Sequence, residues 1–262
     1  MPERWHNPCH DIAEHINTLD EEGRLLAEAA TEAGTGAPVP TCPDWQVRDL
    51  LRHTAMVHAW ATAFLTEGHT TYVRGPAEPD LDGPELLDRF REGHRRLVDA
   101  LKGASPDVQC WTFFAAPSPL AFWARRQAHE TAVHRVDAES ARGGALSPVA
   151  AAHATDGVDE LLRGFHARPK TRLRTEVPRT LRVRATDTGA VWTVELSADP
   201  PRTVRGTGAP TDRAKDRSVD SELSGTARDL YLSLWNRLPL TALTVTGDPA
   251  LARLWQEKSA VN

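Results

Sequence analysis

The chain has 262 residues, of which 40% are hydrophobic and 26% are charged. This composition is typical of globular proteins and excludes a disordered, collagenous or low-complexity chain, and the length is comfortable for two domains. The formal net charge of −5 supplies no overall positive field, so neither nucleic acid nor an anionic membrane surface is an expected partner.

The first two-thirds of the sequence show the 3.6-residue periodicity of amphipathic helices. Segments rich in glycine and proline interrupt this pattern and divide it. We expect helices over residues 11–33, 44–67, 85–102, 120–140 and 148–166. Asp44 is the expected N-cap of the second helix. The four main helices are joined by loops of moderate length, which favours an antiparallel bundle.

From about residue 178 the pattern changes to the alternation of β-strands. Residues 181–185 and 191–196 flank the turn Asp187-Thr188-Gly189 and predict a hairpin. Further strands are expected at 203–205, 218–224 and 243–246, and helices at 226–235 and 249–258. The predicted fold class is therefore α+β, with a helical bundle over residues 1–167 and a small α+β domain over residues 168–262.

A histidine falls within the apolar stripe of the second helix. At 100° per residue, Leu50, Trp60 and Phe64 share one face. His53 falls in the middle of that face, and His58 falls at its edge. A histidine in a buried stripe needs a hydrogen-bond partner or a metal, because its polar atoms have left water. Taken alone, His53 is more simply explained as a hydrogen-bonded core residue.

The fourth helix adds two further candidate ligands. The run from His129 to His134 resembles the H-E-x-x-H zinc-protease motif, but its second histidine comes one residue too late to share a face with the first. Glu130 and His134 are four residues apart and do share a face. With His53 they supply two imidazoles and one carboxylate, a set typical of catalytic zinc and of non-haem iron. The alternative is a Glu–His hydrogen bond between helices.

Other charged side chains near these positions have supporting roles in this interpretation. Asp49 lies one turn before His53, and Asp137 lies about one turn after His134, so either carboxylate can orient an imidazole. Arg125 and Arg126 could hold an anionic substrate, although a solvated role is the default for an arginine. His94 falls on the apolar face of the third helix, where a core or surface position is expected and a pocket residue is the alternative.

The sequence also indicates a compartment. No apolar run reaches the ~20 residues of a membrane-spanning helix, and the first residues lack the pattern of a secretion signal. The three cysteines, odd in number and widely spaced, fit neither a disulfide framework nor a zinc knuckle. We therefore expect a cytoplasmic protein with reduced thiols.

Three stretches of the sequence resemble the mycothiol-dependent maleylpyruvate isomerase family. The first is Val39-Pro-Thr-Cys-Pro-Asp-Trp45, which continues into the second helix as far as His53. The second runs from Phe122 to Asp137 in the fourth helix. The third comprises C-terminal segments at 224–230, 234–239 and 245–248. The resemblance covers nearly the whole chain.

The resemblance implies a DinB-like metal-binding four-helix bundle and a small sterol-carrier-like C-terminal domain. Carried over by position, it implies zinc held by His53, Glu130 and His134. It also implies mycothiol as a thiol cofactor, with Arg237 as the best candidate to contact the thiol. The family belongs to actinobacteria, which agrees with the scarcity of lysine beside arginine in this chain.

The implied activity is addition of a thiolate to a small electrophilic or unsaturated substrate. Both a maleylpyruvate-isomerase-like cis–trans isomerase and a thiol S-transferase begin with this step, so the motifs do not choose between them. The alternative from another class is a non-catalytic DinB-like metal-binding or stress-response protein. A lipid-carrier role for the C-terminal domain would rest on fold analogy alone.

Overall fold

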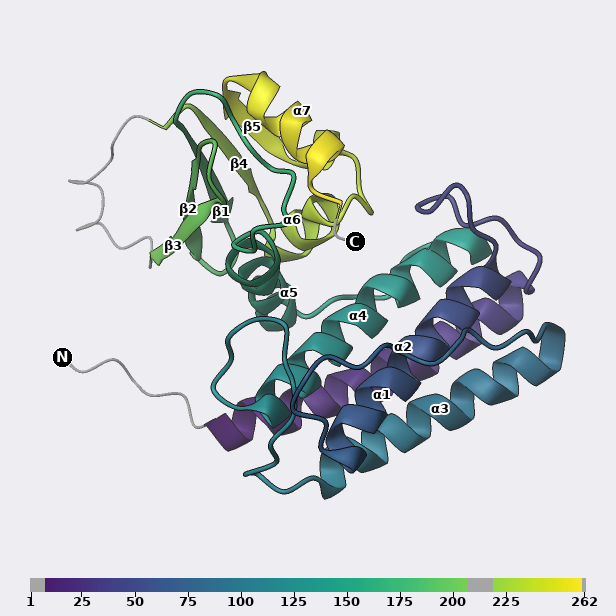
Figure 1. The fold of residues 1–262 in the computed structure, drawn as a ribbon. Helices are drawn as coiled ribbons and strands as arrows, with labels where there is room; N and C mark the ends of the chain where they lie inside the picture. The colour runs from purple at the N-terminus through teal and green to yellow at the C-terminus, as the bar shows by residue number, and fades with distance from the viewer. Residues whose placement is uncertain (1–7, 207–218, 261–262) are drawn as a thin grey trace. The chain divides into compact units, whose positions relative to one another are not determined.

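The structure is a computed structural model that describes residues 8–206 and 219–260. It divides between Ser147 and Pro148 into two units, and each is described by itself. The predicted α+β fold class is confirmed, because a helical unit is followed by a unit with a small mixed sheet (Figure 1).

The first unit is a bundle of four long helices. They are α1 (Pro8–Ala33), α2 (Val47–Glu67), α3 (Gly83–Gly103) and α4 (Pro119–Arg142). Helices α1 and α4 lie side by side, as do α2 and α3, while α1 also contacts α3 and α2 also contacts α4 (Figure 1). Each helix therefore has two neighbours. The α2–α4 contact is the one that builds the candidate site.

Two apolar clusters fill the bundle. One gathers around Phe64 and Trp123, and the other gathers around Leu26, Leu51 and Phe90, all of which are almost completely buried. The burial of such large side chains provides the main driving force for association of the helices. The core therefore explains why one face of α2, which includes Leu50 and Phe64, and most of α4 lie inside the bundle.

The second helix begins later than the sequence predicts. Its N-cap is Gln46 rather than Asp44, and the backbone N–H of Gln46 donates to Oδ2 of Asp49 at 2.9 Å. The preceding segment is fixed by backbone hydrogen bonds, including Val39 N–H to the Trp45 carbonyl oxygen at 2.9 Å. These hydrogen bonds hold the backbone before Gln46 in a non-helical conformation, so Asp44 cannot begin the helix.

The second unit has a five-stranded sheet in the order β3-β2-β1-β4-β5. Its strands are β1 (Arg179–Ala185), β2 (Val191–Leu196), β3 (Arg202–Gly206), β4 (Ser221–Gly225) and β5 (Thr244–Gly247). The pair β1–β4 is parallel, and the other pairs are antiparallel. Val183 is opposite Trp192 and Leu223, and all three are buried, so one face of the sheet carries the core of this unit.

The helices of the second unit are α5 (Ala151–Asp159), α6 (Ala227–Leu234) and α7 (Pro249–Lys258), together with the 3-10 turn η3 (Leu240–Ala242). Helix α5 continues as a π-helix, η1 (Glu160–Phe165), where an uninterrupted helix was predicted. Of the expected strand at 218–224, Ser218 lies outside the described residues. Within the described ranges, none of the helices combines the length and hydrophobicity that a membrane span requires.

The division between the units differs from the predicted boundary at 167/168. It falls between Ser147 and Pro148, so α5 and η1 belong to the second unit. Oδ1 of Asp159 accepts a hydrogen bond from Nε1 of Trp192 at 3.1 Å, and the Leu162 carbonyl oxygen accepts one from Thr203 at 3.3 Å. These bonds join the fifth predicted helix to β2 and β3. The break in periodicity near residue 168 follows the end of η1 at Phe165.

Candidate metal centre

Helices α2 and α4 bring together the three predicted ligands. Nε2 of His53 lies 3.3 Å from Oε1 of Glu130, and Nε2 of His134 lies 3.3 Å from the same oxygen. One potential ligand atom from each side chain lies within 4.8 Å of the other two. A tetrahedral cation with ligands at about 2.1 Å needs donor atoms separated by roughly 3.4 Å, so these separations suit a single shared cation.

The three side chains are unequally exposed. Exposure falls from 26% for the His53 side chain to 21% for Glu130 and 9% for His134. The cluster therefore lies at the margin of the bundle core and is approachable from the His53 side. Three protein ligands would leave the fourth position of a tetrahedral cation for a small ligand, as in catalytic zinc sites.

Asp137 lies behind His134. It is fully buried, and its Oδ2 accepts a hydrogen bond from Nδ1 of His134 at 2.9 Å. Its Oδ1 accepts one from Oγ1 of Thr41 at 2.6 Å, and Sγ of Cys42 lies 3.8 Å from Oδ2. Because Nδ1 carries the hydrogen in this contact, Nε2 of His134 is presented to Glu130. Asp137 therefore occupies the orienting position that the sequence predicts.

Asp49 does not have the predicted orienting role. Its Oδ2 accepts the backbone N–H of Gln46 and caps the start of α2, and its Oδ1 lies 4.0 Å from Nη1 of Arg52. The spacing of one turn permits either arrangement, and the unsatisfied N–H groups at a helix start favour the cap.

Arg126 holds the second oxygen of Glu130. Nη2 of Arg126 lies 3.2 Å from Oε2 of Glu130, which leaves Oε1 toward the two imidazoles. Arg126 is only 3% exposed, so it does not have the solvated role that is the default for an arginine. Its position four residues before Glu130 was the signal that could have identified this contact.

The charges of the site are strongly coupled. Burial alone would raise the pKa of Glu130, but hydrogen bonds with His134 and His53 hold it well below its usual value. Burial alone would lower the pKa of His134, but its contacts with Asp137 and Glu130 raise that pKa to about 9. Glu130 is therefore ionised at neutral pH, and a cation that binds Nε2 of His134 must displace a proton.

Trp45 forms one wall of the site. Its ring centroid lies 5.2 Å from that of His53 and 6.0 Å from that of His134. Trp45 ends the proline-rich segment that precedes α2, so this segment contributes both the ring against the histidines and the Thr41 contact to Asp137. Sequence reasoning did not assign a role to Trp45, although the motif that contains it was recognised.

The two histidines of α2 are placed opposite to their predicted burial. His58 is fully buried, and its Nε2 lies 3.0 Å from Oγ1 of Thr131. Burial lowers the pKa of His58 well below the usual value, so its ring is neutral. His53 is partly exposed at the edge of the helix face. His58 is thus the core histidine, and His53 is free to face the site.

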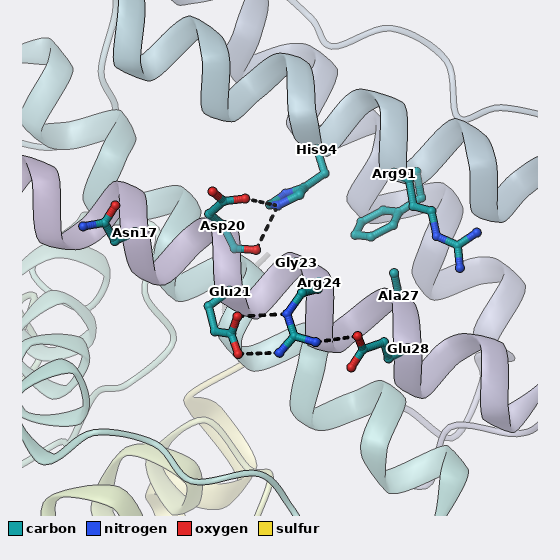
Figure 2. A pocket seen from close by; sticks show the side chains of 10 residues that line it. Asn17, Asp20, Glu21, Gly23, Arg24, Ala27, Glu28, Arg91 and His94 are labelled. Atoms are coloured by element: carbon teal, nitrogen blue, oxygen red, sulfur yellow. Dashed lines mark hydrogen bonds and ion pairs between the residues drawn. The ribbon is translucent and has the colours of Figure 1, made fainter.

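A hollow of about 560 Å³ lies between α1 and α3, and none of the predicted ligands lines it (Figure 2). Several of its charged side chains are paired with one another. Arg24 pairs with Glu21 at 2.6 Å and with Glu28, and Nε2 of His94 lies 3.3 Å from the Asp20 carbonyl oxygen (Figure 2). His94 is largely buried and also borders this hollow, so it combines the expected core position with the pocket position that was the alternative.

Arg237, the predicted thiol contact, lies in the second unit just after α6. Its Nη1 donates a hydrogen bond to the Trp235 carbonyl oxygen at 2.8 Å. Its role toward a thiol stays a prediction from the resemblance.

The fold and the site together define a two-unit protein in which a four-helix bundle carries a candidate divalent-cation centre. The family model of the mycothiol maleylpyruvate isomerase N-terminal domain matches residues 16–139, and that of the MDMPI C-terminal domain matches residues 152–254. The chain therefore belongs to the mycothiol maleylpyruvate isomerase family.

A solved structure agrees with this assignment at the level of the fold. The chain is similar to the crystal structure of a histidine-to-alanine mutant of the mycothiol-dependent maleylpyruvate isomerase, with 13% sequence identity and a TM-score of 0.61. The similarity covers 90% of this chain and 92% of that chain. No curated protein sequence matches the chain.

Proposed function

We propose that this chain is a cytoplasmic enzyme that uses mycothiol and a divalent metal, zinc, to add a thiolate to a small electrophilic or unsaturated substrate. The observation that carries the proposal is the convergence of His53, Glu130 and His134 within 4.8 Å. Membership of the mycothiol maleylpyruvate isomerase family supports the choice of cofactor. The proposed reaction is a cis–trans isomerisation or a thiol S-transfer.

The residues fit a zinc ion. Two imidazole nitrogens and one carboxylate oxygen are ligands that zinc accepts, and three protein ligands leave a fourth position for a small molecule. The side chains behind the ligands also fit, because Asp137 fixes one imidazole and Arg126 fixes the carboxylate. Such outer contacts orient metal ligands, and a carboxylate partner also raises the basicity of an imidazole.

The metal and the thiol supply the reactive group of this proposal. A zinc ion with an open position lowers the pKa of a thiol, which then reacts as a thiolate at neutral pH. Isomerisation and S-transfer share the nucleophilic addition that follows, so the three ligands serve either outcome.

The protein's own groups prepare the site for this chemistry. Glu130 stays ionised, and Asp137 holds the His134 ring so that Nε2 faces the cation position. Trp45 covers the histidines on one side and so limits the access of water to them. Reduced access of water strengthens the electrostatic interactions on which the site depends.

Metal content tests the ligand set. We expect about one zinc per chain in the purified protein, loss of that zinc in His53→Ala and Glu130→Gln, and retention in His69→Ala, a matched change of a partly exposed histidine. Zinc content that is unchanged when His53 and Glu130 are both replaced would exclude this site.

Thiol dependence tests the activity. Mycothiol should change the visible spectrum of the cobalt-substituted protein, and turnover of maleylpyruvate or of a member of an electrophile panel should require mycothiol. Turnover that proceeds equally well without a thiol would exclude the mechanism. Stoichiometric metal with no spectral response to mycothiol would instead favour the non-catalytic metal-binding alternative.

A further inference from the structure

The connection between α2 and α3 lies along the face of α2 that carries His53. We call residues 69–82 the strap. Nε1 of Trp60 donates a hydrogen bond to the Val73 carbonyl oxygen at 2.7 Å, and Nε of Arg52 donates one to the Leu81 carbonyl oxygen at 2.9 Å. Trp60 and Arg52 are about 12 Å apart along the helix at 1.5 Å per residue. The strap therefore runs back along α2 and is fixed to it near both ends.

The middle of the strap approaches α2 closely at Gly75. A Cβ atom at this position would lie 3.1 Å from Sδ of Met56 and 3.4 Å from two ring carbons of Trp60. Met56 and Trp60 follow His53 by about one and two helical turns. The glycine therefore lets the backbone of the strap lie against the same face of the helix as the candidate site.

This course places Glu78 beside His53. Oε1 of Glu78 lies 3.9 Å from Nδ1 of His53, while Nε2 of the same ring faces Glu130 at 3.3 Å. Among the described residues, His53 is the titratable group within ion-pair distance of Glu78. The two carboxylates thus lie on opposite nitrogens of one imidazole.

The other histidine of the site also has a carboxylate at each ring nitrogen, but its Nδ1 contact is a hydrogen bond of 2.9 Å, whereas that of His53 is an ion-pair distance of 3.9 Å. Asp137 lies at Nδ1 of His134, and Glu130 lies at Nε2 of the same ring. The two orienting positions differ in burial, because the Asp137 side chain is fully buried and the Glu78 side chain is 50% exposed. Asp49, the other acidic residue near His53 in sequence, is occupied by the cap of α2.

We propose that Glu78 is a positioning residue of the metal centre, whose carboxylate accepts the Nδ1–H of His53 and directs Nε2 toward the cation. The inference rests on the metal site of the proposed function. An imidazole ligand held by a carboxylate at its other nitrogen is both oriented and more basic. The strap is then part of the metal centre, because it carries Glu78, which orients His53, the most exposed of the three ligands.

Zinc affinity of the full-length protein tests this inference, measured by competition with a chromophoric chelator. We expect Glu78→Ala to weaken zinc binding by at least about tenfold, as is usual when such a partner is removed. Glu78→Gln should be intermediate, because the amide oxygen still accepts a hydrogen bond from Nδ1. The absorption bands of the cobalt-substituted protein should shift in Glu78→Ala.

Asp80→Ala is the matched control. Asp80 lies two residues further along the strap, is fully exposed and is 3.7 Å from Arg52, so its removal takes the same charge from the same segment. We expect its zinc affinity to stay within about twofold of the wild type. Equal affinities for Glu78→Ala and Asp80→Ala would overturn the inference, as would a Glu78→Gln variant as weak as Glu78→Ala.

Displacing the strap gives an independent measurement. The side chain in Gly75→Val would meet Met56 and Trp60, so this variant should also weaken zinc binding. It should add no further loss to Glu78→Ala, because coupled changes are not additive. If the two changes reduce zinc affinity additively in the double variant, the strap does not position Glu78 and the inference is contradicted. If His53→Ala loses zinc but Glu78→Ala keeps it, only this inference fails; a wild type without zinc would remove the proposed function as well.

Discussion

Oδ2 of Asp137 accepts a hydrogen bond from Nδ1 of His134 at 2.9 Å, and this contact sets which nitrogen of the ring faces Glu130. Oδ1 of the same carboxylate accepts a hydrogen bond from Thr41 at 2.6 Å. One buried side chain on α4 therefore links a candidate metal ligand to the segment before α2.

We expect Asp137→Asn to lower zinc affinity by about 10- to 100-fold, because the amide oxygen can replace only one of the two accepting oxygens and the NH2 group cannot accept a hydrogen bond. Chelator competition measures the change, and circular dichroism verifies that the bundle still forms. Asp88→Asn, on the exposed face of α3, is the control. An affinity equal to that of the control would show that His134 needs no carboxylate behind it.

A buried ion pair joins α1 to α4, and its loss should destabilise the bundle. Arg135 is fully buried, and its Nε donates to Oε2 of Glu22 at 2.6 Å. We expect Glu22→Ala to lower the free energy of unfolding by about 3 kcal/mol, because removal of one partner leaves part of a buried charge uncompensated. Glu21→Ala, which removes only an exposed pair with Arg24, should cost less than ~1 kcal/mol. Urea unfolding of the two variants provides the comparison.

Gly23 allows His94 to lie against α1. A Cβ at Gly23 would lie 2.2 Å from Cε1 of His94. We expect Gly23→Ala to cost about 1–3 kcal/mol through this collision. In a His94→Ala background the same change should be neutral or stabilising by up to ~1 kcal/mol, since alanine favours helix. A double-mutant cycle of unfolding free energies measures the coupling, and equal costs in both backgrounds would rule out the collision.

His166 should make the second unit less stable in acid. Burial lowers the pKa of His166 to about 4, against an ordinary value of 6.5. Between these pH values the unfolded chain binds a proton that the folded chain does not. Stability is therefore fully present above pH 6.5 and declines as the pH falls toward 4, by about 3 kcal/mol in total.

His166→Phe tests this expectation, because it removes the titrating group. Urea unfolding of the second unit, followed at Trp255 against which His166 packs, should then show a flatter dependence on pH. His69→Phe, a change at a partly exposed histidine, should leave the dependence as it is. An unchanged slope in His166→Phe would assign the acid sensitivity to other groups.

Local periodicity predicted the parts of the site that depend on a single helix. Glu130 and His134 share a face because they are four residues apart, and the structure places them so. The strand pair β1–β2 was likewise predicted from alternation and one turn signal. Such inferences succeed because the geometry within one element is fixed by hydrogen bonds between near neighbours.

Periodicity did not predict the burial of a side chain where two or more secondary-structure elements pack around it. Helix α2 contacts both α3 and α4, so its buried face is wider than one stripe and includes His58 as well as Leu50. A stripe centred on His53 therefore predicted that His53 is more buried than His58, whereas the structure shows the reverse. Glu78 lies on a segment without periodicity, so no pattern in the sequence could place it beside a ring on α2.

The separation of the three candidate ligands along the chain has a consequence for the order of assembly. Glu130 and His134 become neighbours as soon as α4 forms, whereas His53 is 77 residues away from Glu130 and arrives only when the helices associate. A cation that binds Glu130 and His134 on α4 would gain His53 as a third ligand only when the helices associate. Divalent ions would then accelerate closure of the bundle as well as stabilise its final state.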